Sequence, residues 1–504
     1  MIVRASVALG VLLILSKGAA IANDTIARQN AIAMGARIDE LLETEWRSRE
    51  IVPSRIADDS EFLRRISLDL IGVIPTAGEV RRFNADRTSK KRQTTVDTLL
   101  ESPRHSTHLA NLFREIIMPS SGNDPFNGTA ELQQWLREQF VDNMRYDRIV
   151  SEFLASTGSE QGPAAFYRSL EAKPEKLAST TSRVFLGLQL ECAQCHDHPF
   201  DNWTQKEFWG YAAFFARIQQ PTAMTPNFSV VDVPDGEVTI PDTEQVVAPK
   251  YPRGPHAPED ARGTRRIQLS IWMASRDNPF LPRAAVNRVW SFMFGKGLVN
   301  PVDDIGPHNP PLHPRLMDEL TEYFIEQDFS LKELFRAIAY SDTYQRSSQL
   351  AGDSNSEIEL FERMHVKTLS PDQLYDSLSR ALLQPAEVGI RREFVNRMKT
   401  VSRDSTEYAA GLQQALNLMN GQRISTATSQ SDNGLMGALN APFLHDQQRV
   451  ESAFLTVVSR LPSDEEAQLF VQHISARTSN DERQSAMSDI IWALTNSAEF
   501  QLNH

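Results

Sequence analysis

The stretch ECAQCHDHPFDNWTQKEFWGYAAFFAR, residues 191–217, contains the clearest helix-start signal of this chain. Thr204 is followed three residues later by Glu207, and a run of apolar residues comes directly after. This spacing is typical of a capping box, in which the two side chains satisfy free backbone N–H groups of the first helical turn. The same signature begins again at Thr76 and at Ser330. The sequence therefore predicts a mainly α fold.

Outward from this stretch, the composition divides the chain into two helical domains joined by a Pro-rich connector. We place the first domain at residues 23–217, the connector at 218–262 and the second domain at 263–504. Alternating residues at 228–233 and 237–240 flank a Pro-Asp-Gly turn, which predicts a small β-hairpin within the connector. With 504 residues, of which 41% are hydrophobic, the chain is long enough to bury two cores.

The quoted stretch also opens with a Cys-x-x-Cys-His motif, formed by Cys192, Cys195 and His196. Two thiols at this spacing can form thioethers to the two vinyl groups of one haem, and the adjacent histidine then supplies an axial nitrogen to the iron. We therefore expect one covalent haem c on the two cysteines, with His196 as the iron ligand. His198 is expected to hydrogen-bond beside that ligand, or to serve as an alternative metal ligand.

Three other readings of the cysteine pair remain open. A redox-active disulfide suits Cys-x-x-Cys, although that reading expects a preceding strand and an alternation of strands and helices. Zinc could bind Cys192 and Cys195 with His196 or His198, but a second pair of ligands with its own spacing is absent from the sequence. The pair could also have an inert structural role.

The aromatic residues after the motif allow two interpretations. They could wall a porphyrin, or they could form an ordinary helical core. The residues are Trp203, Phe208, Trp209, Tyr211, Phe214 and Phe215.

The sixth iron ligand would decide whether a haem only transfers electrons or also binds small molecules. The candidates lie far from the motif in the sequence, and a lone methionine or histidine is usually structural. They are Met224, His308, His313 and His365.

A second constellation occupies residues 303–313. Asp303 and Asp304 are followed by His308 and His313 within a rigid proline frame. A carboxylate and an imidazole can act as general base and acid or bind a divalent cation, and functional side chains favour such loops. Asp303, Asp304 and His313 are therefore weak candidates for catalysis; the alternative is that they cap neighbouring helices.

The amino terminus has the pattern of a signal peptide. Arg4 precedes a short apolar run at 7–15, and Ala20 and Ala22 form a small-residue cleavage site. The run is too short to span a bilayer, so we expect residues 1–22 to be removed and the mature chain to carry no transmembrane segment. The predicted location is the periplasm or the extracellular space.

The net charge of −13 argues against a nucleic-acid partner, which would favour a basic face. The charge does not indicate a substrate.

Several segments together resemble the paired domains of unknown function 1549 and 1553, which are abundant in planctomycete-type bacteria. The first domain is matched by 51–54, 57–65, 68–76, 192–201, 203–205 and 211–217. The second is matched by 278–280, 286–290, 294–299, 301–306, 309–314, 344–345, 414–421 and 496–500. The resemblance implies an exported, cytochrome c-associated protein with a haem-binding Cys-x-x-Cys-His and with no established reaction; of the two loop histidines, only His313 matches the family motif.

The chain departs from the family pattern in two places. The separate cytochrome c-like domain that often precedes the pair is missing, so any haem is expected to be single. Residues 105–118 are less aromatic than the family implies, which leaves their part in a shared site in doubt.

Three functions follow as hypotheses. The first is an extracytoplasmic c-type haem protein with a redox or electron-transfer role, an unknown substrate and an unknown redox partner, for which a separate cytochrome c is one candidate. The second is a non-enzymatic binding or assembly module whose haem or zinc is structural. The third is a hydrolase that uses the 303–313 loop. Whether the protein is an enzyme stays open.

Overall fold

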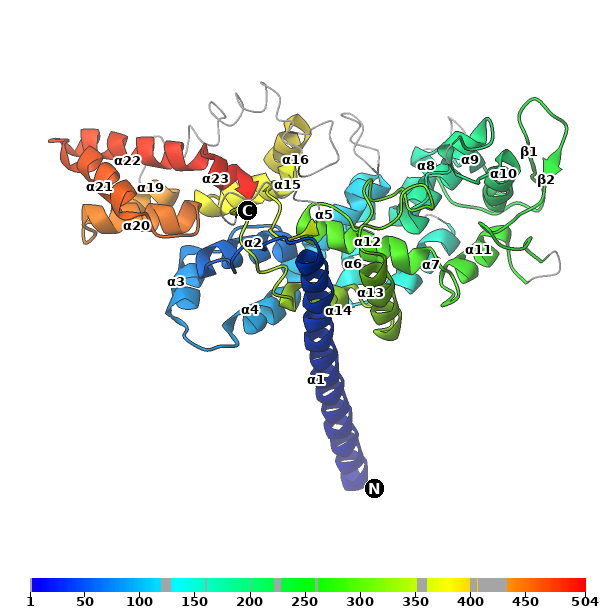
Figure 1. Ribbon diagram of the computed structural model, residues 1–504, viewed down its shortest axis with the longest axis horizontal. Helices are drawn as coiled ribbons and strands as arrows, with labels where there is room; N and C mark the ends of the chain where they lie inside the picture. The colour runs from blue at the N-terminus through cyan, green and yellow to red at the C-terminus, as the bar shows by residue number, and fades with distance from the viewer. Residues whose placement is uncertain are drawn as a thin grey trace.

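The computed structural model describes residues 2–118, 128–158, 161–199, 201–221, 228–258, 262–350, 360–398, 406 and 433–504. Helices dominate these residues, and the strands pair only into two short antiparallel sheets, as the mainly α prediction requires (Figure 1).

The elements up to the connector are α1 (Ile2–Ser48), α2 (Asp59–Ile71), α3 (Ala77–Ala85), α4 (Lys91–Leu100), α5 (Pro103–Ile117), α6 (Thr129–Val141), α7 (Tyr146–Ala155), α8 (Gln161–Ser169), α9 (Pro174–Thr181), the π-helix η1 (Ser182–Leu186), the 3₁₀ helix η2 (Glu191–Gln194), α10 (Gln205–Ala212) and the 3₁₀ helix η3 (Ala213–Phe215). Those that follow are β1 (Val238–Thr239), β2 (Val246–Val247), α11 (Arg265–Met273), α12 (Leu281–Phe294), α13 (Pro314–Glu326), α14 (Leu331–Tyr340), β3 (Lys367–Thr368), α15 (Pro371–Ala381), α16 (Val388–Arg397), α19 (Gly434–Leu439), α20 (Asp446–Val457), α21 (Asp464–Ser475), α22 (Asn480–Thr495), α23 (Ala498–Gln501) and β4 (Leu502–Asn503).

The predicted helix starts are present. Thr76 and Thr204 each form a complete capping box, with Glu79 and Glu207 respectively. The side chain of Ser330 accepts a hydrogen bond from the backbone N–H of Glu333, which caps α14. These local side-chain signals therefore set where the helices begin.

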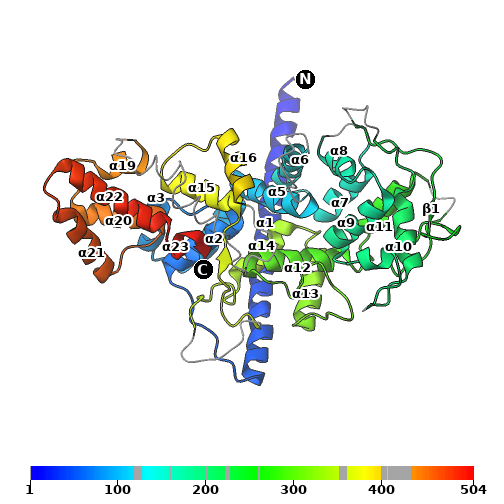
Figure 2. The same ribbon diagram turned by 90° about the horizontal axis from the view of Figure 1, so that it is seen from above.

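The larger apolar core collects buried side chains from Ala31 in α1 to Met364, together with Leu455 of α20, and it includes residues of the predicted connector such as Val238 and Val247. At its centre α1 lies along α14 (Figure 2). Gly35 permits this close packing, because a Cβ atom there would lie 3.1 Å from the backbone oxygen of Ala337. The predicted domain boundaries stay a prediction, but this core is continuous across 218–262.

A smaller core is formed by α15 and the helices α19 to α23; α19 to α22 lie at one end of the molecule, and α15 and α23 lie nearer its middle (Figure 1). Leu68 and Ile74, from the first part of the chain, also belong to it, whereas Leu70 belongs to the larger core. The two cores therefore meet at α2.

Asp69 of α2 is buried at this junction and accepts three hydrogen bonds. Its Oδ1 accepts from Lys367 Nζ at 2.7 Å and from Asn503 Nδ2 at 2.6 Å, and its Oδ2 accepts from the Tyr344 hydroxyl at 2.8 Å. The partners come from β3, β4 and the segment after α14. A charged network thus joins the two cores where their apolar side chains separate.

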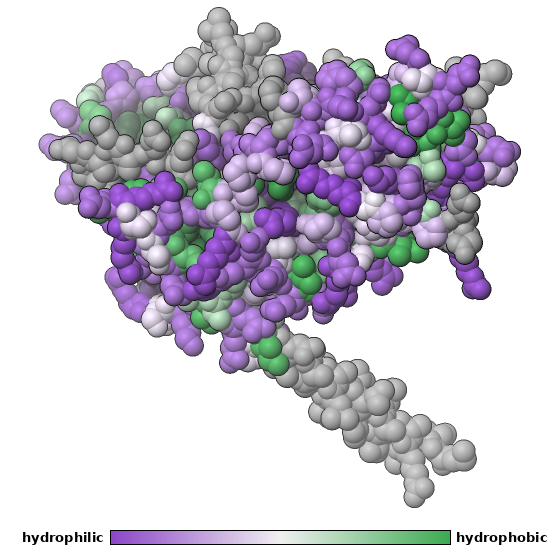
Figure 3. Space-filling model, turned by 45° about the vertical axis from the view of Figure 1, so that its right-hand side comes forward, coloured by the Kyte–Doolittle hydropathy of each residue, from purple (hydrophilic) through white to green (hydrophobic). Residues whose placement is uncertain are grey.

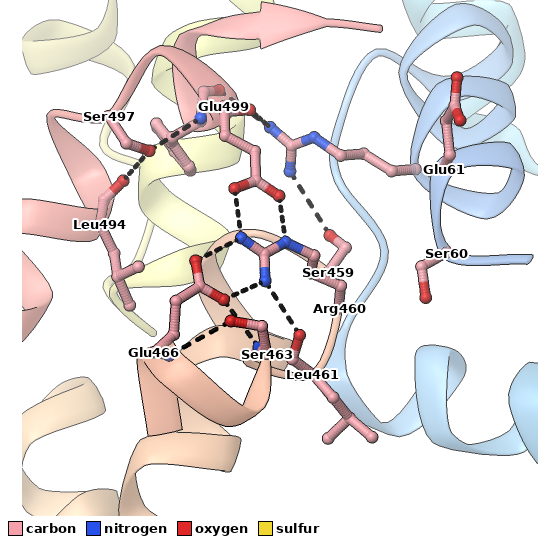
Figure 4. A network of polar contacts seen from close by, with 12 residues as sticks. Ser60, Glu61, Ser459, Arg460, Leu461, Ser463, Glu466, Leu494, Ser497 and Glu499 are labelled. Atoms are coloured by element: carbon pink, nitrogen blue, oxygen red, sulfur yellow. Dashed lines mark hydrogen bonds and ion pairs between the residues drawn. The ribbon is translucent and has the colours of Figure 1, made fainter. Parts of the chain in front are cut away.

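A second polar network stabilises the smaller core (Figure 4). The Arg460 guanidinium lies between two carboxylates, 2.7 Å from Glu466 Oε2 and 2.6 Å from Glu499 Oε1. Hydrogen bonding by Arg460 lowers the pKa of Glu466 to about 2. Arg64 of α2 donates to the backbone oxygen of Glu499 at 3.0 Å, so this network also connects α2 to α23.

The connector contains a hairpin, but the pairing differs from the predicted one. Val238 and Thr239 pair with Val247 and Val246, so the second strand lies further along the chain. In place of a strand at 228–233, Val230 bridges to Gly158 and Asp232 to Ile218. Alternation identified extended backbone correctly, yet it does not specify the partner of each strand.

Over the described residues, no helix is long and apolar enough to span a bilayer. The face seen in Figure 3 is mostly polar, with apolar side chains scattered over it.

Candidate functional site

The cysteine motif lies on a short 3₁₀ turn at the surface. The helix η2 ends at Gln194. Its residue Ala193 is fully buried, and this burial anchors the turn to the core. Cys192 and Cys195 are free thiols and both are exposed. His196 is exposed beside them. Both thiols and the imidazole are therefore accessible to a group approaching from solvent.

The imidazole of His196 is oriented by its own backbone neighbour. Its Nδ1 atom lies 2.8 Å from the backbone oxygen of Asp197, and a carbonyl can only accept, so Nδ1 carries the proton. The remaining nitrogen, Nε2, is then the one with a free lone pair. Metal-ligating histidines are commonly fixed in this way, with one nitrogen donating to a backbone oxygen and the other available to the metal.

Residues of α10 hydrogen-bond to the motif and fix its position. The backbone N–H of Gln205 donates to Asp197 Oδ1 at 2.8 Å, and its side-chain amide donates to the Cys195 oxygen at 3.0 Å. The Trp209 indole donates to the Gln194 oxygen at 3.1 Å. The capping box that starts α10 thus also positions the helix that supports the motif.

His198 is fixed by the turn that follows. The backbone N–H of Asp201 donates to His198 Nδ1 at 2.9 Å, and the backbone N–H of His198 donates to the backbone oxygen of Trp203 at 2.8 Å. The His198 ring faces the ring of His308, with their centroids 6.1 Å apart. His198 therefore connects the motif to the 303–313 loop.

Asp201 is the meeting point of three distant segments. Its side chain is only 4% exposed and lies 3.0 Å from Arg253 Nη2 of the connector and 3.6 Å from His308 Nδ1. The Arg253 guanidinium stacks over Trp203, with its carbon 4.6 Å from the ring centroid. A Cβ atom on Gly306 would lie 3.0 Å from Asp201 Oδ2, so the loop backbone approaches closely here.

One of the three catalytic candidates of the loop lies at this same place: Asp304 Oδ1 is 3.0 Å from His308 Nε2. Asp303 pairs elsewhere, with its Oδ2 2.9 Å from Nη1 of Arg183 in η1. His308, which the sequence analysis weighed as a distant iron ligand and ranked below His313 within the loop, is the residue that joins the loop to the motif. Its spacing of four residues from Asp304 was the only local signal for this role.

His313 lies elsewhere. It precedes α13, is 8% exposed, and faces the ring of Phe361 at a centroid distance of 6.2 Å. Burial lowers its pKa. His365 lies against the same phenylalanine at 5.9 Å, whereas Met224 falls outside the described residues. Of the sixth-ligand candidates that the structure describes, His308 is the one next to the motif.

The aromatic residues that follow the motif are buried side chains of the larger core and pack against one another and their neighbours. Their burial agrees with the second of the two interpretations, in which these aromatic residues form an ordinary helical core. Among the described residues, no three His, Cys, Asp or Glu side chains are arranged to hold a metal ion.

Comparison with protein families returns two matches. Residues 37–220 match the model PSCyt2, described as a protein of unknown function (DUF1549). Residues 265–390 match the model PSD1, described as a protein of unknown function (DUF1553). The motif lies in the first match and the 303–313 loop in the second. No curated protein and no solved structure matches the chain.

Proposed function

Because this chain carries the domains of unknown function 1549 and 1553 in that order, we propose that it is an exported c-type haem protein with an electron-transfer role. The observation that carries the proposal is the exposed Cys192-x-x-Cys195-His196 turn, in which Nδ1 of the histidine is already hydrogen-bonded. The cytochrome-associated name of the first family model agrees with it.

The donor set of the turn fits a covalently attached haem. Thioether formation needs two accessible thiols, and both cysteines are free and exposed. Axial ligation needs one imidazole nitrogen that is not already hydrogen-bonded, and with Nδ1 donating to the Asp197 carbonyl that nitrogen is Nε2. When bound, a haem supplies one-electron redox chemistry at the iron.

The residues around the turn have a positioning role in this proposal. Gln205 and Trp209 of α10 hold the backbone of Gln194 and Cys195, so the turn that carries the thiols stays fixed against this helix. Because the neighbouring aromatic side chains are already packed in the core, the motif remains at the surface. A surface location suits electron exchange with a second protein, for which a separate cytochrome c is the partner class that we propose.

Export is part of the proposal, because c-type haem attachment takes place outside the cytoplasm. Among the described side chains of α1, Ala31 is the first that belongs to the larger core, and it lies after the predicted cleavage before Asn23.

The test is to express the full chain in a periplasm that performs cytochrome c maturation and to record the pyridine haemochrome spectrum. We expect a covalent haem at one equivalent per chain, which stays with the polypeptide under denaturing conditions. The Cys192→Ser/Cys195→Ser double variant should lose it. His473→Ala, which alters an exposed histidine on α21, is the matched control and should retain it.

A folded wild-type chain without covalent haem, from a strain that matures a reference cytochrome, would overturn the proposal. One equivalent of zinc in that chain would favour the zinc alternative. If haem is attached, a Soret shift with carbon monoxide on the reduced protein would show that the sixth iron position is open or weakly held.

A further inference from the structure

A cavity of about 140 Å³ lies where the end of α4, the start of α5, the end of α6 and the start of α14 come together. It is separate from the cysteine motif, since it shares no residue with it and α4 and α10 lie on opposite sides of α1 in Figure 1. Nothing in the proposed electron-transfer role uses it.

His105 of α5 is the chemically distinctive residue of the cavity lining. It is 6% exposed, and its Nδ1 lies 2.8 Å from the backbone oxygen of Leu70, to which it must donate. The ring also packs edge-on against Phe335, with centroids 5.6 Å apart. The ring orientation is therefore fixed, and Nε2 remains as a hydrogen-bond acceptor.

Nε2 is the remaining polar atom of the His105 ring. Over the described residues, Nδ1 makes the hydrogen bond to Leu70 and no group donates to Nε2. His105 lines the cavity, so we infer that Nε2 is the atom that it offers to a ligand there. Burial lowers the pKa of His105 to about 4, so the imidazole stays neutral and Nε2 keeps its lone pair near neutral pH.

The rest of the lining is of mixed polarity. Leu109 and Leu331 are buried walls and Met144 closes another side, whereas Ser102, Ser106 and Asn143 bring polar groups to it. Lys332 pairs with Glu101, whose side chain is 57% exposed, so this ion pair marks the solvent side of the cavity. A cavity of about this volume is large enough for a benzene-sized ring.

We propose that this cavity binds a small aromatic alcohol, whose ring lies against the leucines and whose hydroxyl donates a hydrogen bond to Nε2 of His105. A ligand of this class matches both the leucine side chains and the imidazole acceptor. A neutral ligand is favoured, because the charged lining residues Lys332 and Glu101 already pair with each other and a charged ligand would be desolvated without a counter-charge.

The test uses phenol as the probe and the full chain labelled with ¹³C at its methionine methyl groups. Phenol should shift the Met144 signal, assigned through Met144→Leu, in a saturable titration at millimolar concentration. Met487, which is buried in the smaller core, should not move. Fluorobenzene has a similar size but cannot donate, so it should bind about 5-fold more weakly, as expected for one neutral hydrogen bond.

His105→Phe keeps an aromatic ring but removes the acceptor, and it should abolish the preference for phenol over fluorobenzene. If this variant does not fold, the comparison of the two probes on the wild-type chain decides alone. Leu109→Phe, which fills the cavity, should eliminate the shift for both probes. An unmoved Met144 signal, or equal affinities for the two probes on the wild-type chain, would overturn the proposal.

Discussion

His308 and Asp201 contact each other across the boundary between the two matched domains, with His308 Nδ1 3.6 Å from a carboxylate oxygen that is almost fully buried. The same carboxylate pairs with Arg253, so the Arg253 guanidinium and the His308 imidazole share one acidic side chain. The charge of Asp201 is therefore expected to contribute more to the free energy of unfolding than the charge of an exposed surface carboxylate.

We predict that Asp201→Asn lowers the free energy of unfolding by about 1–2 kcal/mol, because it leaves a guanidinium and an imidazole beside a neutral, buried amide. Urea unfolding measures the change. Asp489→Asn is the control, since Asp489 pairs with His473 but its side chain is 62% exposed, and its effect should be close to zero. Equal effects of the two variants would contradict the prediction.

Gly306→Ala should destabilise the contact between the loop and the motif. The added Cβ would lie 2.8 Å from the His308 ring and 3.0 Å from Asp201 Oδ2, so one of these must shift. Overpacking of this kind costs about 1–3 kcal/mol in the free energy of unfolding, and hydrogen exchange at 301–309 should become faster.

The matched control for that variant is Gly389→Ala in α16, where an added Cβ meets nothing within 4 Å. There, the better helix propensity of alanine should raise stability by about 0.5–1 kcal/mol. If both alanines change stability in the same direction, the close approach at Gly306 is not what determines the effect.

Lys367→Met should be the most damaging of these substitutions. Lys367 and Asp69 are 6% and 3% exposed, and removal of one partner leaves the other charge buried. Such a loss costs about 3–5 kcal/mol, measurable as a shift of the urea midpoint. Lys176→Met removes a lysine whose pair with Glu171 is exposed, and it should cost less than about 1 kcal/mol.

The stability of the protein should fall in mild acid because of two buried histidines. Burial lowers the pKa of His105 to about 4 and that of His108 to about 3, whereas both have a pKa of 6.5 when unfolded. The unfolded chain therefore binds more protons than the folded chain below pH 6.5. Their contribution is complete above that pH and is lost progressively as the pH falls toward 4, by about 6 kcal/mol in total.

His108→Gln should reduce this pH dependence by about one proton, as measured by urea unfolding at several pH values between 6.5 and 4. His473→Gln, on the surface of α21, should leave the slope unchanged. A variant at His108 with the wild-type slope would show that the histidine does not remain neutral in the folded chain.

The part of the fold that was predictable rests on local chemistry. A capping box such as Thr204 with Glu207 satisfies backbone groups within one turn, so its spacing alone indicates the helix start. The strand pairing in the connector was wrong, because alternation at 228–233 cannot tell whether the partner is the next segment or Gly158 and Ile218. Pairing is decided by contacts between distant residues.

The candidate site divides in the same way. The donor set of Cys192, Cys195 and His196 is contiguous and could be read from its spacing. The convergence of Asp201 with His308 could not, because it depends on how the loop after α12 packs against the motif. His313 shares a loop with His308, yet a turn of backbone places it beside Phe361.

The larger core has a consequence for how such genes evolve. Its side chains come from both matched segments, and Leu68 and Ile74 of the first segment contribute to the other core as well. A recombination event that exchanged one segment for an unrelated sequence would expose apolar surface in the remaining one. The two segments are therefore expected to be inherited together and to acquire compensating substitutions at their shared boundary.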